Sequence, residues 1–165
     1  MKNNTFFKLF IIMTGALLLR LWYIDKPEGL WNDEYVGWFI ASENNLHKLI
    51  EEIFNNCHMP FYYLYLKVWM LLFKDTDLSL RISSVIPSIL TIPVVFLIGK
   101  ELKDIKTGFL TCFLTAISSF CIYFAQEVRL YSLLILFTSC IILYFIKSIK
   151  EKSKINILLY FIFNA

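Results

Sequence analysis

Four short segments of the chain carry polar and ionisable side chains that could do chemistry, and each lies close to a long apolar run. They hold Asp33-Glu34, His58 followed by Pro60, Arg81, and Gln126-Glu127 with Arg129. Ionisable groups at membrane depth are costly, and by default they suggest a function. Carboxylates that face a histidine and two arginines could combine a site for an anionic ligand with a general base. Such a site forms only if the fold brings these segments to one face.

Each of these residues also has a purely structural interpretation. Asp33 could cap a following helix by accepting from its free backbone N–H groups, and His58 could mark the start of a helix. Three arginines near the ends of apolar runs could extend to lipid headgroups; they are Arg20, Arg81 and Arg129. Glu127 and Arg129 are too close in sequence for a same-face helical pair, so each would have to pair across helices.

The composition places this chemistry in a membrane protein. Of the 165 residues, 58% are hydrophobic and only 18% are charged, whereas a soluble domain has roughly 25% charged residues. The net charge of +3 is small and scattered, so no nucleic-acid partner is expected. Three of the four cysteines lie in apolar runs without metal-type spacing, which favours packing. No cofactor follows from the sequence, and a divalent metal is left open.

Apolar runs of membrane length predict an all-α fold, a polytopic transmembrane helical bundle. A span needs to cover about 30 Å of hydrocarbon at about 1.5 Å per residue. The expected spans are about 6–24, 82–98, 108–124, 130–146 and 155–165. The last span is incomplete because the chain ends inside it, and we therefore expect the N-terminal part of a longer protein.

The topology depends on a shorter apolar stretch, 60–73, which carries a lysine. If this stretch stays at the membrane surface, the lysines of the N-terminus and of the 100–106 and 147–154 loops fall on one side. The segment 25–58, with seven carboxylates and two lysines, falls on the other. The positive-inside rule favours this arrangement. It predicts a multi-pass cell-membrane protein with a cytoplasmic N-terminus and an outer loop over 25–81.

The outer loop is expected to have structure of its own. Pro27-Glu28-Gly29 is typical of a turn. Apolar residues recur at helical spacing over 44–55, with charged residues on the opposite side, which predicts an amphipathic helix in the interface plane. Together with a juxtamembrane helix over 60–73, these surface helices would form a layer on the membrane.

Four motifs in this order resemble the polyprenyl-phosphate-sugar glycosyltransferases, the membrane enzymes related to protein O-mannosyltransferases and lipid A aminoarabinose transferases. The motifs are Leu30-Trp31-Asn32-Asp33-Glu34, His58-Met59-Pro60-Phe61-Tyr62-Tyr63, Leu80-Arg81-Ile82-Ser83-Ser84 and Gln126-Glu127-Val128-Arg129-Leu130-Tyr131-Ser132. The ordered set is more specific than any one motif, and the resemblance extends from about residue 6 to the end of the chain.

The resemblance implies a GT-C-like fold in which the first outer loop covers a donor-binding cavity. It implies that Asp33 is the catalytic base on an acceptor hydroxyl and that Glu34 supports it. His58, Arg81 and Arg129 would bind the donor phosphate, with Gln126 and Glu127 as possible supports. The implied partners are a polyprenyl-phosphate sugar donor, a protein, lipid or polysaccharide acceptor, and the bilayer.

Two features depart from the family pattern, and they leave other interpretations open. The usual His-Pro-Pro stretch has Met59 before Pro60, and the C-terminal spans and outer domain of the family are missing. A part of a transporter, a scaffold or an inactive fragment of the family would share the apolar runs. Transporters place polar groups near the bilayer midplane, whereas these charges are expected at one interface, which favours the enzyme.

Overall fold

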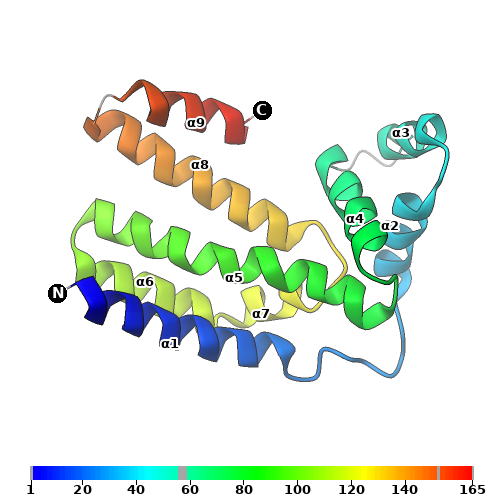
Figure 1. Ribbon diagram of the computed structural model, residues 1–165, viewed down its shortest axis with the longest axis horizontal. Helices are drawn as coiled ribbons and strands as arrows, with labels where there is room; N and C mark the ends of the chain where they lie inside the picture. Colours follow the sequence, from blue (N-terminus) through cyan, green and yellow to red (C-terminus); the bar gives the residue numbers. More distant parts are fainter. Residues whose placement is uncertain (1, 56–58, 152, 165) are drawn as a thin grey trace.

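The computed structural model describes residues 2–55, 59–151 and 153–164, and in these ranges the chain forms helices and turns without a strand. One group of helices lies side by side as an elongated bundle (Figure 1). Its members are α1 (Lys2–Leu21), α5 (Asp77–Leu102), α6 (Ile105–Ile117), α7 (Ser119–Ala125), α8 (Tyr131–Glu151) and α9 (Lys154–Asn164). A second group gathers at one end of the bundle and consists of α2 (Asn32–Ser42), α3 (Leu46–Asn55) and α4 (Pro60–Leu72). The predicted all-α bundle with additional short helices is confirmed.

Three helices of the described chain, α1, α5 and α8, are long and apolar enough to cross a membrane. A fourth crossing forms if α6 and α7 count as one span, which bends by 55° at its break. Helix α1 ends at Leu21, three residues before the end of the expected range 6–24, and α5 extends beyond the expected range 82–98 at both ends. The protein is therefore a multi-pass membrane protein. The last helix of the bundle, α9, has only 11 residues.

The break between α6 and α7 is stabilised by a buried arginine from α1. The Arg20 side chain donates to Ser88 Oγ at 2.8 Å and to the carbonyls of Ala116 at 3.1 Å and Thr115 at 3.4 Å. These carbonyls belong to the last turn of α6, where acceptors lack intrahelical partners and a positive charge is favourable. Ser118 then caps α7 by accepting from Cys121 N. Arg20 is fully buried, so it does not extend to headgroups.

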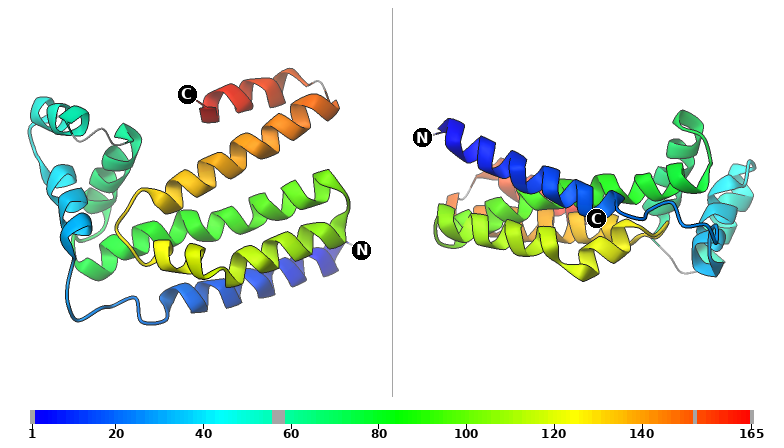
Figure 2. Two further views of the ribbon diagram at one scale, coloured as in Figure 1. Left: turned by 180° about the vertical axis from the view of Figure 1, so that it is seen from behind. Right: turned by 90° about the horizontal axis from the view of Figure 1, so that it is seen from below.

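The two ends of the bundle differ in character. The N-terminus, the α5–α6 turn and the α8–α9 turn lie at one end, and α2–α4 lie at the other (Figures 1 and 2). At the first end, Lys150 Nζ lies 3.9 Å from a carboxylate oxygen of Glu101. We call this the lysine-rich end and the other the α2–α4 end. The segments that the lysine partition assigned to one side therefore share one end of the molecule.

The α2–α4 end has its own apolar core. Leu49 and Ile53 of the amphipathic α3 are buried against α2 and α4. Helix α4 has 13 residues, a length of about 20 Å, which is shorter than the ~30 Å of a bilayer core. Its one lysine, Lys67, donates to the carbonyls of Ala41 at 3.3 Å and Glu43 at 2.6 Å. The lysine in this apolar helix therefore caps the C-terminal end of α2.

Candidate functional site

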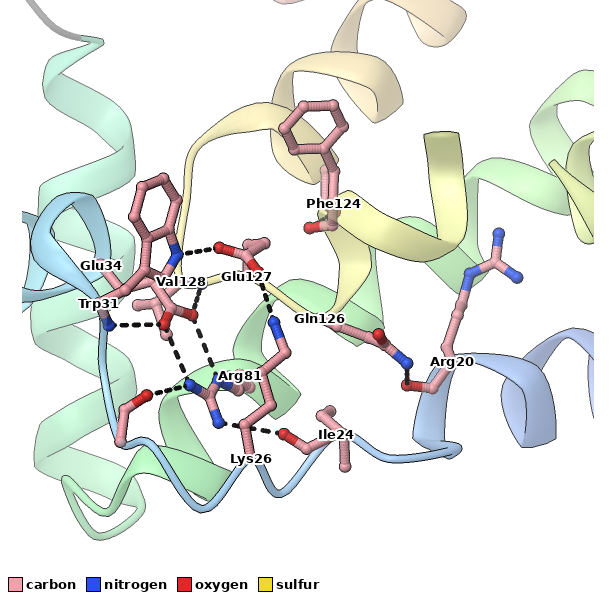
Figure 3. Close-up of polar contacts among 12 residues, drawn as sticks. Arg20, Ile24, Lys26, Trp31, Glu34, Arg81, Phe124, Gln126, Glu127 and Val128 are labelled. Carbon is pink, nitrogen blue, oxygen red and sulfur yellow. Dashed lines mark hydrogen bonds and ion pairs between the residues drawn. The ribbon is translucent and has the colours of Figure 1, made fainter. Parts of the chain in front are cut away.

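The site is organised by the turn between α7 and α8, residues 126–129. This turn packs along the segment between α1 and α2, residues 22–31, which we call the first loop. All four residues of this turn bond to partners between residues 20 and 34, and Figure 3 shows several of these contacts. Gln126 Nε2 donates to the carbonyls of Arg20 at 3.1 Å and Trp22 at 2.7 Å, next to the C-terminal end of α1. Gln126 thus fixes the start of the first loop, next to the C-terminal end of α1.

Glu127 and Glu34 are the two buried carboxylates of this region (Figure 3). One oxygen of Glu127 lies 2.5 Å from Lys26 Nζ, and the other accepts from the indole N–H of Trp31. A buried charge is tolerated when it is paired and hydrogen-bonded. Glu127 therefore stabilises the loop, and its proximity to Arg129 in sequence does not make the two a pair.

Glu34 forms a two-point ion pair with Arg81 at the start of α5. Arg81 Nε lies 3.2 Å from one carboxylate oxygen and Arg81 Nη2 lies 3.1 Å from the other, and both side chains have no exposed surface. Glu34 also accepts from Val128 N at 2.8 Å and from Trp31 N at 3.3 Å. The second contact is that of an N3 glutamate at a helix start. Glu34 thereby joins α2, α5 and the 126–129 turn.

Arg81 donates four hydrogen bonds to protein acceptors. Besides Glu34, it donates to the carbonyl of Ile24 at 3.2 Å and to that of Gly29 at 2.6 Å. Gly29 has a φ of 74°, in the left-handed region that favours glycine. The predicted turn at Pro27-Glu28-Gly29 is thus present, and Arg81 fixes it. Arg81 lies inside the protein rather than at lipid headgroups.

Asp33 points away from this buried network and pairs with Arg129. Arg129 Nη1 donates to Asp33 Oδ2 at 2.6 Å, and the side chains are 23% and 48% exposed for Arg129 and Asp33. The guanidinium also lies over two aromatic rings, 5.6 Å from the centre of Trp31 and 4.9 Å from that of Tyr131, as cations favour. Among the described residues Asp33 accepts no backbone N–H, and Glu34 serves the helix start instead. Asp33 is therefore a solvent-accessible carboxylate beside a cation.

Asp33 and Arg129 line a cavity of about 170 Å³ at the α2–α4 end. The other lining residues come from α2, α4 and the 126–129 turn with its following residue; they are Val36, Gly37, Tyr62, Tyr63, Val128 and Leu130. Tyr62 is 3% exposed, and its hydroxyl has no hydrogen-bond partner among the residues described. Burial raises the pKa of Tyr62 well above its ordinary value, and the nearby tyrosines and Glu34 act in the same direction. Its hydroxyl therefore stays protonated.

The structure brings most of the predicted site residues together, in two layers. Asp33 and Arg129 line the cavity, whereas Glu34, Arg81 and Glu127 are buried and the partly exposed Gln126 bonds to the end of α1. His58 lies outside the described residues. No group of three or more metal-ligating side chains occurs in the part of the chain that the structure describes.

Sequence reasoning missed Tyr62, Lys26 and Trp31 as parts of this region. Tyr62 belongs to one of the four quoted motifs, but nothing in an apolar Phe-Tyr-Tyr run shows which ring faces a cavity. Lys26 and Trp31 flank the predicted turn, and their shared partner, Glu127, lies about a hundred residues away. Only the folded chain shows these pairings.

The fold is that of a polytopic helical membrane protein, and comparison with known families shows its class. The family model of the dolichyl-phosphate-mannose-protein mannosyltransferases matches residues 57–165. This match covers more than half of the chain, so the protein belongs to that family. Neither the curated proteins nor the solved structures include a match to this chain.

Proposed function

We propose that the protein transfers a sugar from a polyprenyl-phosphate-linked donor to an acceptor hydroxyl at the outer membrane face. The observation that carries this proposal is the exposed Asp33–Arg129 ion pair in a cavity at the α2–α4 end. A carboxylate and a guanidinium side by side offer a base and an anion-binding group at one place. Family membership independently supports a glycosyltransferase with a lipid-linked donor.

In the proposed reaction the acceptor oxygen attacks the anomeric carbon of the donor sugar. A C–O bond forms to the acceptor as the bond from the sugar to the phosphate oxygen breaks, and the electron pair leaves with polyprenyl phosphate. Asp33 takes the proton that the acceptor hydroxyl loses. Arg129 stabilises the negative charge that develops on the leaving phosphate. The prenyl tail remains in lipid, which places the reaction at the membrane interface.

The ion pair in the ligand-free structure implies an exchange of partners. Arg129 holds Asp33 through one nitrogen, Nη1, and its position over two aromatic rings leaves it close to the cavity. A donor phosphate competes with Asp33 for this cation because both are oxyanions. Donor binding would therefore free the Asp33 carboxylate for the acceptor, and we propose that the donor binds first.

Arg81 receives a different role from the one that the sequence suggested. Its four hydrogen bonds to protein acceptors and its complete burial leave it without access to the cavity. We propose that Arg81 and Glu34 act as positioning residues, which hold the first loop and the 126–129 turn so that Asp33 and Arg129 meet. The proposed donor contact of His58 stays a prediction from the family resemblance.

The orientation in the membrane is proposed from the lysine partition. The lysine-rich end would be cytoplasmic by the positive-inside rule, and the N-terminus lies at that end (Figure 1). The cavity at the α2–α4 end then faces the outer side, and the short α4 would lie along the interface.

A direct test is to incubate the full chain in lipid nanodiscs with synthetic polyprenyl-phosphate mannose and a panel of acceptors. The expected result is release of polyprenyl phosphate that depends on the protein and is accelerated by one class of acceptor. Donors with other sugars report the sugar preference in the same assay. Donor that stays intact with every acceptor, beside a family member that turns it over, would contradict the proposal.

A further inference from the structure

The hydroxyl group of Tyr62 is buried without a hydrogen-bond partner among the described residues. Leaving a hydroxyl unpaired in this way costs about 1–3 kcal/mol, and most buried polar groups in native proteins are paired. Phenylalanine would fill the same space without that cost. The neighbouring Tyr65 has the usual arrangement, because its hydroxyl donates to the carbonyl of Ser83 at 2.7 Å. The unpaired hydroxyl of Tyr62 therefore needs an explanation.

Tyr62 lies at the wall of the cavity that Asp33 and Arg129 share. The wall next to its hydroxyl is formed by Gly37, where an added Cβ atom would lie 3.8 Å from the Tyr62 oxygen and 3.4 Å from the Val128 carbonyl oxygen. Because residue 37 is a glycine, no α2 side chain packs against the hydroxyl at this point. Asp33, Gly37 and Tyr62 come from two helices that pack on each other.

We propose that the Tyr62 hydroxyl donates a hydrogen bond to a phosphate oxygen of the lipid-linked donor, beside Arg129, when that donor occupies the cavity. This inference rests on the proposed function. An O–H group is a donor that suits an anionic oxygen, and the guanidinium of Arg129 supplies the opposite charge in the same cavity. The raised pKa of Tyr62 keeps it in the donating form through the physiological range.

The hydroxyl is closed off from solvent in the ligand-free structure, so a ligand reaches it only after the cavity wall opens. Asp33 and Arg129 line the same cavity, and an entering anion would compete with Asp33 for Arg129. Tyr62 is thus a binding residue that becomes satisfied in the donor complex. Because the hydroxyl is unpaired in the free protein and paired in the complex, the hydrogen bond to the donor contributes favourably to the free energy of binding.

The test measures binding of polyprenyl phosphate, without a sugar, to the full chain in nanodiscs. Tyr62→Phe is expected to weaken this binding about tenfold, as the loss of one hydrogen bond to a charged group does. The matched control is Tyr65→Phe, which removes a hydroxyl from the same helix but outside the cavity lining. It is expected to bind polyprenyl phosphate as the wild type does.

Thermal unfolding of the same variants without ligand gives a readout that is independent of activity. Tyr62→Phe is expected to unfold at the same or a higher temperature than the wild type, because it removes an unpaired group. Tyr65→Phe is expected to unfold at a lower temperature, because it breaks a hydrogen bond. A loss of stability in Tyr62→Phe comparable to that in Tyr65→Phe would show that the hydroxyl has a partner in the free protein and would overturn the inference.

Gly37→Ala provides a second variant that does not depend on Tyr62 itself. The added methyl group meets its neighbours at ordinary van der Waals distances, and alanine favours a helix over glycine. The variant is therefore expected to fold at least as stably as the wild type while binding polyprenyl phosphate more weakly. Wild-type binding of polyprenyl phosphate by Tyr62→Phe would overturn the inference and leave the proposed function intact. A wild-type protein that does not bind polyprenyl phosphate would overturn both.

Discussion

Arg129 and Asp33 are 96 residues apart in sequence, and a hydrogen bond of 2.6 Å joins their side chains. This contact forms because the 126–129 turn is fixed along the first loop by three neighbouring contacts. They are the contacts from Gln126 to the end of α1, from Glu127 to Lys26 and from Val128 to Glu34. The charged pair at the cavity therefore depends on neighbouring contacts that hold the 126–129 turn in place.

Arg129→Met is expected to raise the apparent KM for the lipid-linked donor and to lower kcat/KM about 10- to 100-fold. The estimate follows from the loss of a charged hydrogen bond to the phosphate, worth about 1.5–3 kcal/mol. The kcat/KM of Arg129→Lys is expected to lie between those of Arg129→Met and the wild type, because lysine keeps the charge but not the planar donor geometry. Steady-state kinetics at varied donor concentration measure both.

Lys48→Met is the matched control, because it removes a positive charge from the exposed face of α3 outside this cavity. Its kinetics are expected to equal those of the wild type. An unchanged kcat/KM in Arg129→Met would remove this residue from the donor site.

Glu34→Gln and Arg81→Met are each expected to destabilise the α2–α4 end by about 3–5 kcal/mol, because each leaves an unpaired charge or polar group in a dry interior. The double variant should lose less stability than the two single variants lose in sum, since it removes both partners of the ion pair. Thermal unfolding in detergent and limited proteolysis of the first loop measure this coupling. If Arg81→Met instead folded as stably as the wild type and raised only the KM for donor, Arg81 would be a phosphate-binding residue after all.

Membrane topology provides a third prediction. With the native cysteines replaced, a single cysteine at exposed position 45 is expected to react with an impermeant reagent on intact cells, whereas one at exposed position 103 is not. The reason is that the α2–α4 end and the lysine-rich end would lie on opposite sides of the membrane. Labelling at 103 but not at 45 would invert the proposed orientation and place the cavity in the cytoplasm.

The helical bundle could be predicted from sequence because its determinants are local. Apolar runs of membrane length predict α1, α5 and α8, and the helical spacing of Leu49 and Ile53 predicts α3. The break at Ser118 was not predicted, because the stretch 108–124 is long and apolar enough for one span and the contacts at the break come from Arg20, a residue of another helix.

The candidate site could be predicted only in part. Asp33, Glu34, Arg81 and Arg129 were singled out by residue type and by a family resemblance, but sequence did not separate the exposed pair from the buried one. That division depends on packing: Glu34 meets Arg81 inside the protein, whereas Asp33, one residue earlier on the helix, points to the cavity. Tyr62 could not be recognised at all, since its defining property is that its hydroxyl has no hydrogen-bond partner among the described residues.

The most direct measurement of the proposed role of Asp33 is the rate of sugar transfer by Asp33→Asn in the full chain. Asparagine keeps the shape and can still accept a hydrogen bond from Arg129, but it cannot take the acceptor proton. The transfer rate is expected to fall by about 10²–10⁴, as the loss of a general base does, while membrane insertion and donor binding stay near wild type. Asp25→Asn, the same change at an exposed position of the first loop outside the cavity lining, should leave the rate unchanged. A wild-type transfer rate in Asp33→Asn at full membrane expression would contradict the catalytic role of this carboxylate.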